Sequence, residues 1–172
     1  AVDLIMGEQK TSHLYNVEVE PDFTVYTPAM MAALRTLQDL NVPLMITGAY
    51  VGSDAVIENN KEVIDFMKDV LHYQQRNNHS SQTGTVMSVD AKRNGFALPA
   101  CTFMTKEGYS QYRVEAPDAL EPADKKGMRV YRYSDTSMNA GVAYDGKQRI
   151  VVLGFPFESI IGEAEREGVM NG

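Results

Sequence analysis

The chain has 172 residues, of which 44% are hydrophobic and 23% are charged. This length and composition are typical of one globular domain that needs neither a disulfide nor a metal ion to fold, and they disfavour intrinsic disorder. The formal net charge of −7 disfavours binding to nucleic acid without sequence preference. No apolar run approaches the roughly 20 residues that span a bilayer as a helix.

Both ends of the sequence indicate a piece of a longer polypeptide. No Met opens the chain, and the apolar run Val2–Met6 already predicts a buried strand. The last residues, Gly162–Gly172, end within a polar helical pattern. The opening residues do not have the pattern of a signal peptide. We therefore expect one domain over residues 1–172 that belongs to a larger multidomain protein.

The first half of the chain alternates strand and helix patterns. Thr27-Pro28 predicts a helix start, because Thr caps a helix and Pro suits its first position. Leu44–Thr47 predicts a short buried strand, and Asn59-Asn60 predicts a second helix start. Tyr73–Ser81 is predicted to be a polar connection. The order strand, helix, strand, helix favours a parallel sheet.

The second half is richer in strand patterns. Short strand-like runs separated by Gly, Pro, Asn and Asp cover Thr85–Val89, Phe96–Met104, Ser110–Glu115 and Arg129–Tyr133. Asp145-Gly146 lies between two further runs, Ala140–Tyr144 and Gln148–Leu153, and predicts an antiparallel hairpin with a type I′ turn. Glu163–Met170 predicts a final helix. We expect an α/β fold with a mostly parallel sheet, flanking helices and an antiparallel hairpin extension.

A glycine-bounded turn follows the predicted strand Leu44–Thr47. In α/β enzymes such a turn raises one side chain at the C-terminal edge of the sheet, and Tyr50 holds that position here. A tyrosine is a poor nucleophile without strong activation, and a plain strand-to-loop turn fits the pattern equally well. Ser53 or Asp54 would cap a helical turn that follows.

A second segment, Ile150–Ser159, runs from a buried strand into an apolar, proline-stiffened turn with one carboxylate, Glu158. Glu158 is either a catalytic or orienting acid or a surface acid near a helix start, and the surface interpretation is favoured. In open α/β sheets ligands bind beyond the C-terminal ends of the strands. Any site is therefore expected near Gly48–Asp54 and Phe155–Glu158.

Other residues that could carry chemistry give weaker signals. No histidine has metal-ligand spacing with another ligand, so neither a metal site nor a cofactor is expected; the histidines are His13, His72 and His79. Cys101 has apolar neighbours and no nearby cation, which favours a buried and slowly reacting thiol.

Two clusters have both a functional and a structural interpretation. An acidic cluster lacks the spacing of an EF-hand and is expected to be a solvated loop; its members are Glu115, Asp118, Glu121 and Asp124. Tyrosines suit either a carbohydrate-stacking site or ordinary strand positions, and the second interpretation is favoured; they are Tyr109, Tyr112, Tyr131, Tyr133 and Tyr144.

The two segments together resemble the class I glutamine amidotransferases. Gly48-Ala49-Tyr50-Val51-Gly52 has the form of their nucleophile elbow, Gly-x-Cys-x-Gly, and Val152–Glu158 occupies the place of their Phe-His-Pro-Glu turn. In that family the Cys attacks the glutamine amide, and the His, oriented by the Glu, acts as its base. Tyr50 stands at the Cys position and Pro156 or Phe157 at the His position, so only Glu158 matches. The resemblance implies a flavodoxin-like fold without glutaminase chemistry. Because each histidine is far from Tyr50 in the sequence, we also expect no histidine beside the Tyr50 hydroxyl.

The chain is also similar, over nearly its whole length, to an amidotransferase-like domain of large bacterial surface proteins labelled xanthan lyase-related. The shared phrases are Val2–Gln9, Gly48–Asp54, Tyr112–Asp118, Ala140–Tyr144 and Gly154–Glu158. The similarity implies a secreted, periplasmic or outer-surface location in a bacterium. The label implies polysaccharide β-elimination, but such lyases resemble an α-toroid joined to β-sandwiches, a pattern that this chain lacks.

We therefore expect a non-catalytic binding or scaffolding module whose partners are neighbouring domains of the same polypeptide, with carbohydrate as a further candidate. The alternative is a hydrolase of carbohydrate or peptide that uses Ser53, Asp54 and Glu158 around Tyr50. A hydrolase needs a nucleophile and a base within about 3 Å of each other or joined through one water. A binding module needs only a concave surface with a few placed polar groups.

Overall fold

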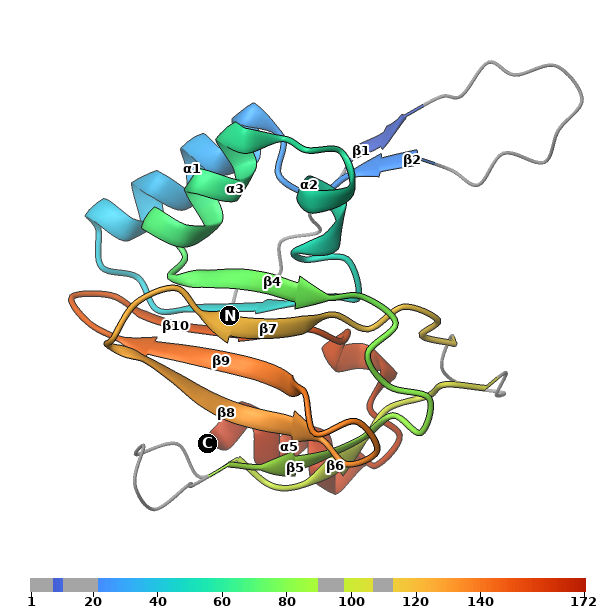
Figure 1. Cartoon of the computed structure of the whole chain (residues 1–172). Helices are drawn as coiled ribbons and strands as arrows, with labels where there is room; N and C mark the ends of the chain where they lie inside the picture. The colour runs from blue at the N-terminus through green and yellow to red at the C-terminus, as the bar shows by residue number, and fades with distance from the viewer. Residues whose placement is uncertain (1–7, 11–21, 90–97, 107–112) are drawn as a thin grey trace, which may run out of the picture.

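A curled, mixed sheet of six strands forms the centre of the computed structural model, which describes residues 8–10, 22–89, 98–106 and 113–172 (Figure 1). In spatial order the strands are β3 (Leu44–Thr47), β10 (Arg149–Leu153), β9 (Asn139–Asp145), β8 (Gly127–Tyr133), β5 (Thr85–Ser88) and β6 (Cys101–Thr102). Only β3 and β10 pair in parallel; the other neighbours in this sheet are antiparallel. The sheet curls into a half-barrel.

Two further pairs of strands accompany this sheet. β1 (Glu8–Lys10) pairs with β2 (Asp22–Thr24), and β4 (Tyr73–Asn77) pairs with β7 (Ala119–Pro122), both antiparallel. β7 lies close to β9 (Figure 1), but β8 and β10 occupy both edges of β9, so the second pair is a separate two-stranded sheet.

The helices cover the sheet from two sides. α1 (Pro28–Asp39), α2 (Ser53–Ile57) and α3 (Lys61–Asp69) lie on one side, while α5 (Glu163–Asn171) lies on the other (Figure 1). Thr27 Oγ1 accepts the Met30 N–H at 3.2 Å and Asn60 Oδ1 accepts the Val63 N–H at 3.2 Å, so α1 and α3 begin as the sequence predicts. A short 3₁₀-helix, η1 (Phe157–Ser159), follows β10. No helix of the described residues is long and apolar enough to cross a membrane.

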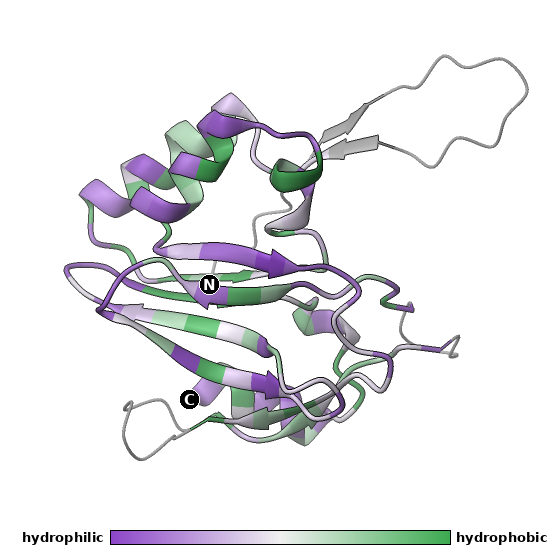
Figure 2. Cartoon of the chain, in the orientation of Figure 1, coloured by the Kyte–Doolittle hydropathy of each residue, from purple (hydrophilic) through white to green (hydrophobic). Residues whose placement is uncertain are grey.

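Alternating residues of β9 and β10 belong to two different hydrophobic cores. Val142, Ile150 and Val152 pack in the core beneath α1 and α3. Ala143 and Leu153 pack on the opposite face, in the core that α5 closes. Strand side chains alternate between the two faces of a sheet, so an apolar run without alternation, such as Ile150–Leu153, indicates a strand buried on both faces. In Figure 2, β9 carries green and pale segments between purple ends.

The expectation of a flavodoxin-like, mostly parallel sheet with flanking helices is wrong. The structure is mostly β, and its parallel pair joins β3 to the last strand of the sheet, β10, rather than to the next strand along the chain. The chain leaves β3, forms α2 and α3, and then enters β4, which pairs antiparallel with β7. The segment from β3 through α2 and α3 to β4 is therefore not a β–α–β unit with two parallel strands. The predicted strand Val2–Met6 lies outside the described residues.

Two strands were missed because they lie in segments that were predicted to be polar connections or loops. β4 has the sequence Tyr-Gln-Gln-Arg-Asn and was predicted to be part of a polar connection; Figure 2 shows it in hydrophilic colours. Its partner β7 lies where the sequence analysis placed a solvated acidic loop. Conversely, the predicted strand Phe96–Met104 yields only the two residues of β6 among its described residues, and the described part of Ser110–Glu115 is not a strand.

The hairpin of β9 and β10 is confirmed, but its turn is not of type I′. Asp145 pairs with Arg149, so three residues lie between the paired ends. Type I′ geometry needs positive φ at both central residues, and neither Asp145 nor Gly146 has it. Gly146 is required for a different reason, because a Cβ there would lie 2.3 Å from a ring carbon of Tyr144. That ring stacks on the imidazole of His72, with centroids 3.6 Å apart.

We predict that Gly146→Val lowers the free energy of unfolding by about 1 kcal/mol or more, because the new side chain displaces Tyr144 from His72. Equilibrium urea unfolding of the two proteins measures the change. Lys147→Val, at the exposed neighbouring position, is the control and should stay close to wild type. Equal midpoints for Gly146→Val and wild type would contradict this account of the turn.

Candidate functional site

The parallel pairing of β3 with β10 brings the two segments singled out in the sequence to the same edge of the sheet. Thr47 is the register partner of Leu153. Just beyond the strands, the Gly48 N–H donates to the Leu153 carbonyl at 3.2 Å, and the Phe157 N–H donates to Thr47 Oγ1 at 3.2 Å. The turns after β3 and β10 are therefore held together by backbone and side-chain hydrogen bonds.

The candidate residues at this edge differ in accessibility. Tyr50 lies in the turn between β3 and α2, as expected, and is 49% exposed. Ser53, at the start of α2, is only 1% exposed. Asp54 Oδ2 accepts the Val25 N–H at 3.0 Å, and Glu158 is exposed on η1. The expectation that no histidine approaches Tyr50 stays a prediction, because His13 lies outside the described residues.

Asp118 is the carboxylate at the centre of this edge, and the sequence analysis did not identify it. It was expected in a solvated loop, whereas it is fully buried. Its Oδ2 accepts the N–H groups of Gly52 at 2.8 Å and Ser53 at 3.0 Å. Asp118 therefore caps α2 from a distant part of the chain, in place of the predicted Ser53 or Asp54. No local pattern reveals this cap, because its donors lie more than 60 residues away.

Burial raises the pKa of the Asp118 carboxyl to about 7. The N–H groups of Ser53 and Gly52 and the Ser53 hydroxyl oppose this rise, and the charge of Asp54 adds to it. Within the part of the chain that the structure describes, neither Asp118 Oδ1 nor Ser53 Oγ has a hydrogen bond of ordinary geometry. Asp118 therefore changes protonation near neutral pH, in a position that no substrate reaches in this structure.

A chain of buried tyrosine hydroxyls supports the turn from below. Tyr73 donates to the Val51 carbonyl at 2.5 Å, and the Tyr26 and Tyr73 hydroxyl oxygens are 2.6 Å apart, so Tyr26 donates to Tyr73. Burial raises the pKa of both hydroxyls, which keeps them protonated. These hydrogen bonds fix the backbone at Val51. Because Ser53 is buried as well, this edge of the sheet is closely packed.

The acidic cluster of the sequence is dispersed in the fold. Asp118 caps α2, while Glu121 and Asp124 pair with basic side chains of the described residues. Glu115 Oε1 lies 3.3 Å from Arg113 Nη2. Among the described residues, no group of three His, Cys, Asp or Glu side chains is arranged to hold a metal ion.

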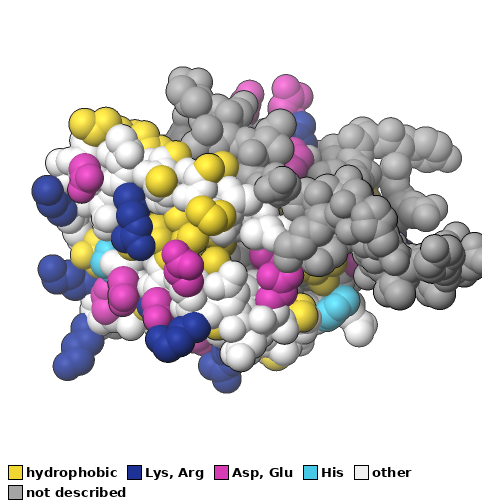
Figure 3. All heavy atoms as spheres, turned by 90° about the horizontal axis from the view of Figure 1, so that it is seen from above, with side chains coloured by type: hydrophobic (Ala, Val, Ile, Leu, Met, Phe, Trp, Pro, Cys, Tyr) yellow, Lys and Arg dark blue, Asp and Glu magenta, His cyan; other side chains and the backbone are white. Residues whose placement is uncertain are grey.

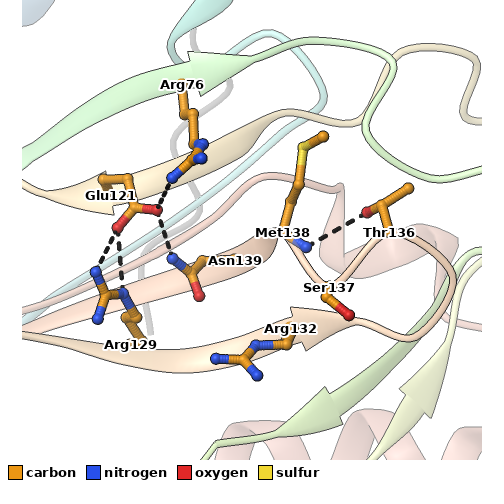
Figure 4. A pocket seen from close by; sticks show the side chains of 8 residues that line it. All are labelled: Arg76, Glu121, Arg129, Arg132, Thr136, Ser137, Met138 and Asn139. Atoms are coloured by element: carbon orange, nitrogen blue, oxygen red, sulfur yellow. Dashed lines mark hydrogen bonds and ion pairs between the residues drawn. The ribbon is translucent and has the colours of Figure 1, made fainter.

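A polar hollow of about 370 Å³ lies elsewhere, where β4, β7, β8 and β9 meet (Figure 4). It is lined by Arg76, Glu121, Arg129, Arg132, Thr136, Ser137, Met138 and Asn139. Glu121 lies at its base with its side chain 16% exposed. Its Oε1 accepts from Arg76 Nη1 at 3.1 Å and Asn139 Nδ2 at 2.8 Å, and its Oε2 accepts from Arg129 Nη2 at 2.9 Å and Nε at 3.2 Å.

Arg132 is the cation of this hollow that pairs with no carboxylate of the described residues. Figure 4 shows its guanidinium beside the hollow with no interaction to the residues drawn, and it has no ion pair within the described ranges. Three arginines and one glutamate line the hollow, so its formal charge is 3 − 1 = +2. On the face that α1 and α3 form, by contrast, cationic and anionic side chains are intermixed (Figure 3). The hollow concentrates positive charge on a chain whose net charge is −7.

Scans against models of protein families and searches of curated proteins and of solved structures found no match for this chain. The resemblance to amidotransferase-like domains therefore stays a hypothesis, and the functional argument depends on the geometry of the chain itself.

Cys101 lies in the core that α5 closes and is 2% exposed, as the sequence predicts. Burial raises the pKa of its thiol to about 12, although the Tyr131 hydroxyl partly offsets the rise. The thiolate is the reactive form. We predict slow labelling of native Cys101 by a thiol reagent at neutral pH and fast labelling in urea. Rapid stoichiometric labelling of the folded protein would contradict this prediction.

We predict that Asp118→Asn changes how stability depends on pH. The folded protein holds the Asp118 proton up to about pH 7, whereas the unfolded chain releases it near the ordinary value of about 4. Wild-type stability should therefore fall relative to the variant as pH rises from about 4 to about 7, by on the order of 4 kcal/mol at most. Urea unfolding at several pH values measures the difference.

Asp135 gives the control of opposite sign. Burial alone would raise the pKa of its carboxyl, but the N–H groups of Gln82 and Thr83 and the Ser81 hydroxyl lower it. Asp135→Asn should therefore cost stability at neutral pH and less in acid, below the ordinary pKa of about 4. A stability difference between wild type and Asp118→Asn that does not change with pH would show that the pKa of Asp118 is the same in the folded and the unfolded protein, and would contradict the prediction.

Proposed function

We propose that this chain is a non-catalytic binding module that takes an anionic group into the arginine-lined hollow. The single observation that carries the proposal is the guanidinium of Arg132, which has no ion pair among the described residues. It lies beside Arg76 and Arg129, which both pair with Glu121. Arginine presents a planar fork of N–H donors that suits carboxylate and phosphate oxygens. A bound anion would offset the repulsion among these cations.

The form of the hollow supports binding. Its volume is within the range of small-molecule sites, roughly 300 to 1,000 Å³, and it is built on four strands rather than on long loops. The ion pairs of Glu121 fix the guanidinium groups of Arg76 and Arg129 in advance. Donors that are already ordered lose less conformational freedom when a ligand binds.

Catalysis at the β3–β10 edge has less support. The hydrolase alternative requires Ser53 to reach a substrate, but this side chain is 1% exposed. It also requires a free carboxylate, and Asp54 accepts a backbone N–H from Val25. A secreted, periplasmic or outer-surface location in a bacterium, with neighbouring domains as partners, remains part of the proposal and depends on the sequence resemblance alone.

Carbohydrate recognition by ring stacking also has little support. Tyr131 and Tyr133 are fully buried, and Tyr144 stacks on His72. Tyr109 and Tyr112 lie outside the described residues. A carbohydrate partner would therefore have to bind through an anionic substituent rather than through a sugar face.

Anion titrations followed by the amide NMR spectrum test the proposal. With sodium sulfate and, separately, sodium acetate added at constant ionic strength, we expect saturable shifts at Arg132, Thr136, Ser137 and Asn139 for at least one anion. Arg132→Gln should weaken this binding about tenfold or more, because a charge-assisted hydrogen bond to the anion is lost.

Arg149→Gln is the matched control. Arg149 is an exposed strand arginine outside the hollow, 3.6 Å from Asp145, and its replacement changes the net charge by the same amount. Binding by Arg149→Gln should equal that of wild type. The absence of saturable shifts with both anions, or equal losses in the two variants, would overturn the proposal.

A further inference from the structure

We propose that the outer edge of β3 is a docking site for a parallel strand, and that Val2–Met6 of the same chain is the strand that binds there. β3 is the last strand at one side of the six-stranded sheet, and β10 is its only strand partner among the described residues. Val2–Met6 lies outside those residues, and its apolar sequence predicts a buried strand. This proposal does not depend on anion binding in the hollow.

The backbone of β3 directs hydrogen-bonding groups away from β10. The Gly48 N–H donates to the Leu153 carbonyl, and the backbone groups of a strand alternate in direction from one residue to the next. The groups of Ile46 therefore also face β10, whereas those of Met45 and Thr47 face the outer edge. An edge of this kind is a template for a further strand.

The side chains of β3 also favour a neighbour at this edge. Ile46 is buried in the core beneath α1 and α3, and Leu44 packs against that core. Met45 points to the opposite face of the sheet, where its register partner Val151 packs against the core that α5 closes. Met45 is nevertheless 40% exposed. A strand beyond β3 would cover it from the side.

The position of Glu8 determines the direction of such a strand. Glu8 pairs with Thr24, and the Val25 N–H donates to Asp54 Oδ2 in α2 at 3.0 Å. α2 follows the C-terminal end of β3, so the chain enters Glu8 near that end. A strand over residues 2–6 that lies along β3 must therefore run parallel to it. Parallel strands need a long crossover, usually through a helix, and α1 lies between these two segments of the chain.

The length and the pattern of the segment suit this edge. At about 3.3 Å per residue, five residues span about 17 Å and the four residues of β3 span about 13 Å. Strand side chains alternate between two faces, so Val2, Leu4 and Met6 share one face and Asp3 lies on the other. The apolar face suits the core beneath α1, and the mixed face suits the side on which Met45 is exposed.

NMR spectroscopy of the intact chain tests the pairing directly. We expect nuclear Overhauser contacts between the amide protons of Met45 and Thr47 and the backbone of Val2–Met6. These two amides should also exchange with solvent about a hundredfold or more slowly than in the unfolded chain, because they are hydrogen-bonded. In a sample that mixes isotope-labelled and unlabelled chains, the contacts should occur only within one chain.

Leu4→Asp is the variant that should open the edge. A carboxylate on the apolar face would be buried without a partner, so exchange at Met45 and Thr47 should become about tenfold faster or more. Leu4→Val keeps an apolar, strand-forming residue and should retain slow exchange. Asp3→Asn changes the charge on the other face and is the matched control, with exchange as in wild type. Amides of β8 should exchange slowly in every variant, which distinguishes opening of the edge from unfolding.

Two results would overturn the proposal. The first is fast exchange at Met45 and Thr47 in wild type, or slow exchange there without contacts to Val2–Met6. The second is contacts between labelled and unlabelled chains, which would show that a second copy supplies the strand. Neither result affects the proposed function, because the residues that line the hollow do not belong to β3.

Discussion

The buried carboxyl group of Asp118 joins the parts of the chain on which the rest of the fold depends. Its side chain caps α2, its backbone N–H donates to the Gly154 carbonyl at 2.7 Å, and its own carbonyl accepts the Tyr133 hydroxyl at 2.7 Å. Gly154 permits this contact, since a Cβ there would lie 2.0 Å from the Asp118 oxygen. Four elements, α2, β7, β8 and β10, thus meet at one residue, and the turn that carries Tyr50 depends on it.

Burying a carboxyl group is costly unless its hydrogen bonds compensate for lost hydration. Two backbone N–H groups do so at Oδ2, while Oδ1 has no hydrogen bond of ordinary geometry to the described residues. This imbalance explains why the group keeps its proton to about pH 7. Tyr26 and Tyr73 also stabilise this edge of the sheet, because their hydroxyls hydrogen-bond to each other and Tyr73 donates to the Val51 carbonyl. The edge resembles a catalytic turn in sequence because both need sharp, glycine-bounded backbone, but here the close packing serves the fold.

Local signals predicted local structure well. The caps at Thr27 and Asn60, the strand Leu44–Thr47 and the hairpin of β9 and β10 depend on residues near in sequence, and each is present. Topology could not be predicted in the same way, because the partner of β3 is β10, about a hundred residues later. β4 escaped detection because only Tyr73 of its residues is fully buried.

The candidate sites show the same difference between features set by residues near in sequence and features set by residues far apart in sequence. Tyr50 and Glu158 lie at the sheet edge that their sequence context indicates. The arginine hollow has no sequence signature, because Arg76, Glu121 and Arg132 come from three strands that the fold alone brings together. Asp118 was assigned to solvent because acidic residues near one another in sequence are usually exposed. Both misses concern side chains whose environment is set by distant segments.

β9 has a consequence for how this chain can evolve. Its residues Ala140, Gly141 and Ala143 are small, yet the strand separates two hydrophobic cores. A Cβ at Gly141 would already lie 2.8 Å from Leu153 Cδ2 and 3.3 Å from Val130 Cγ2. A substitution that enlarges a side chain of β9 therefore requires a second substitution that makes a side chain on a neighbouring strand smaller. Both contacts belong to the core that α5 closes, so the sizes of Leu153 and Val130 are matched to the absence of a side chain at Gly141.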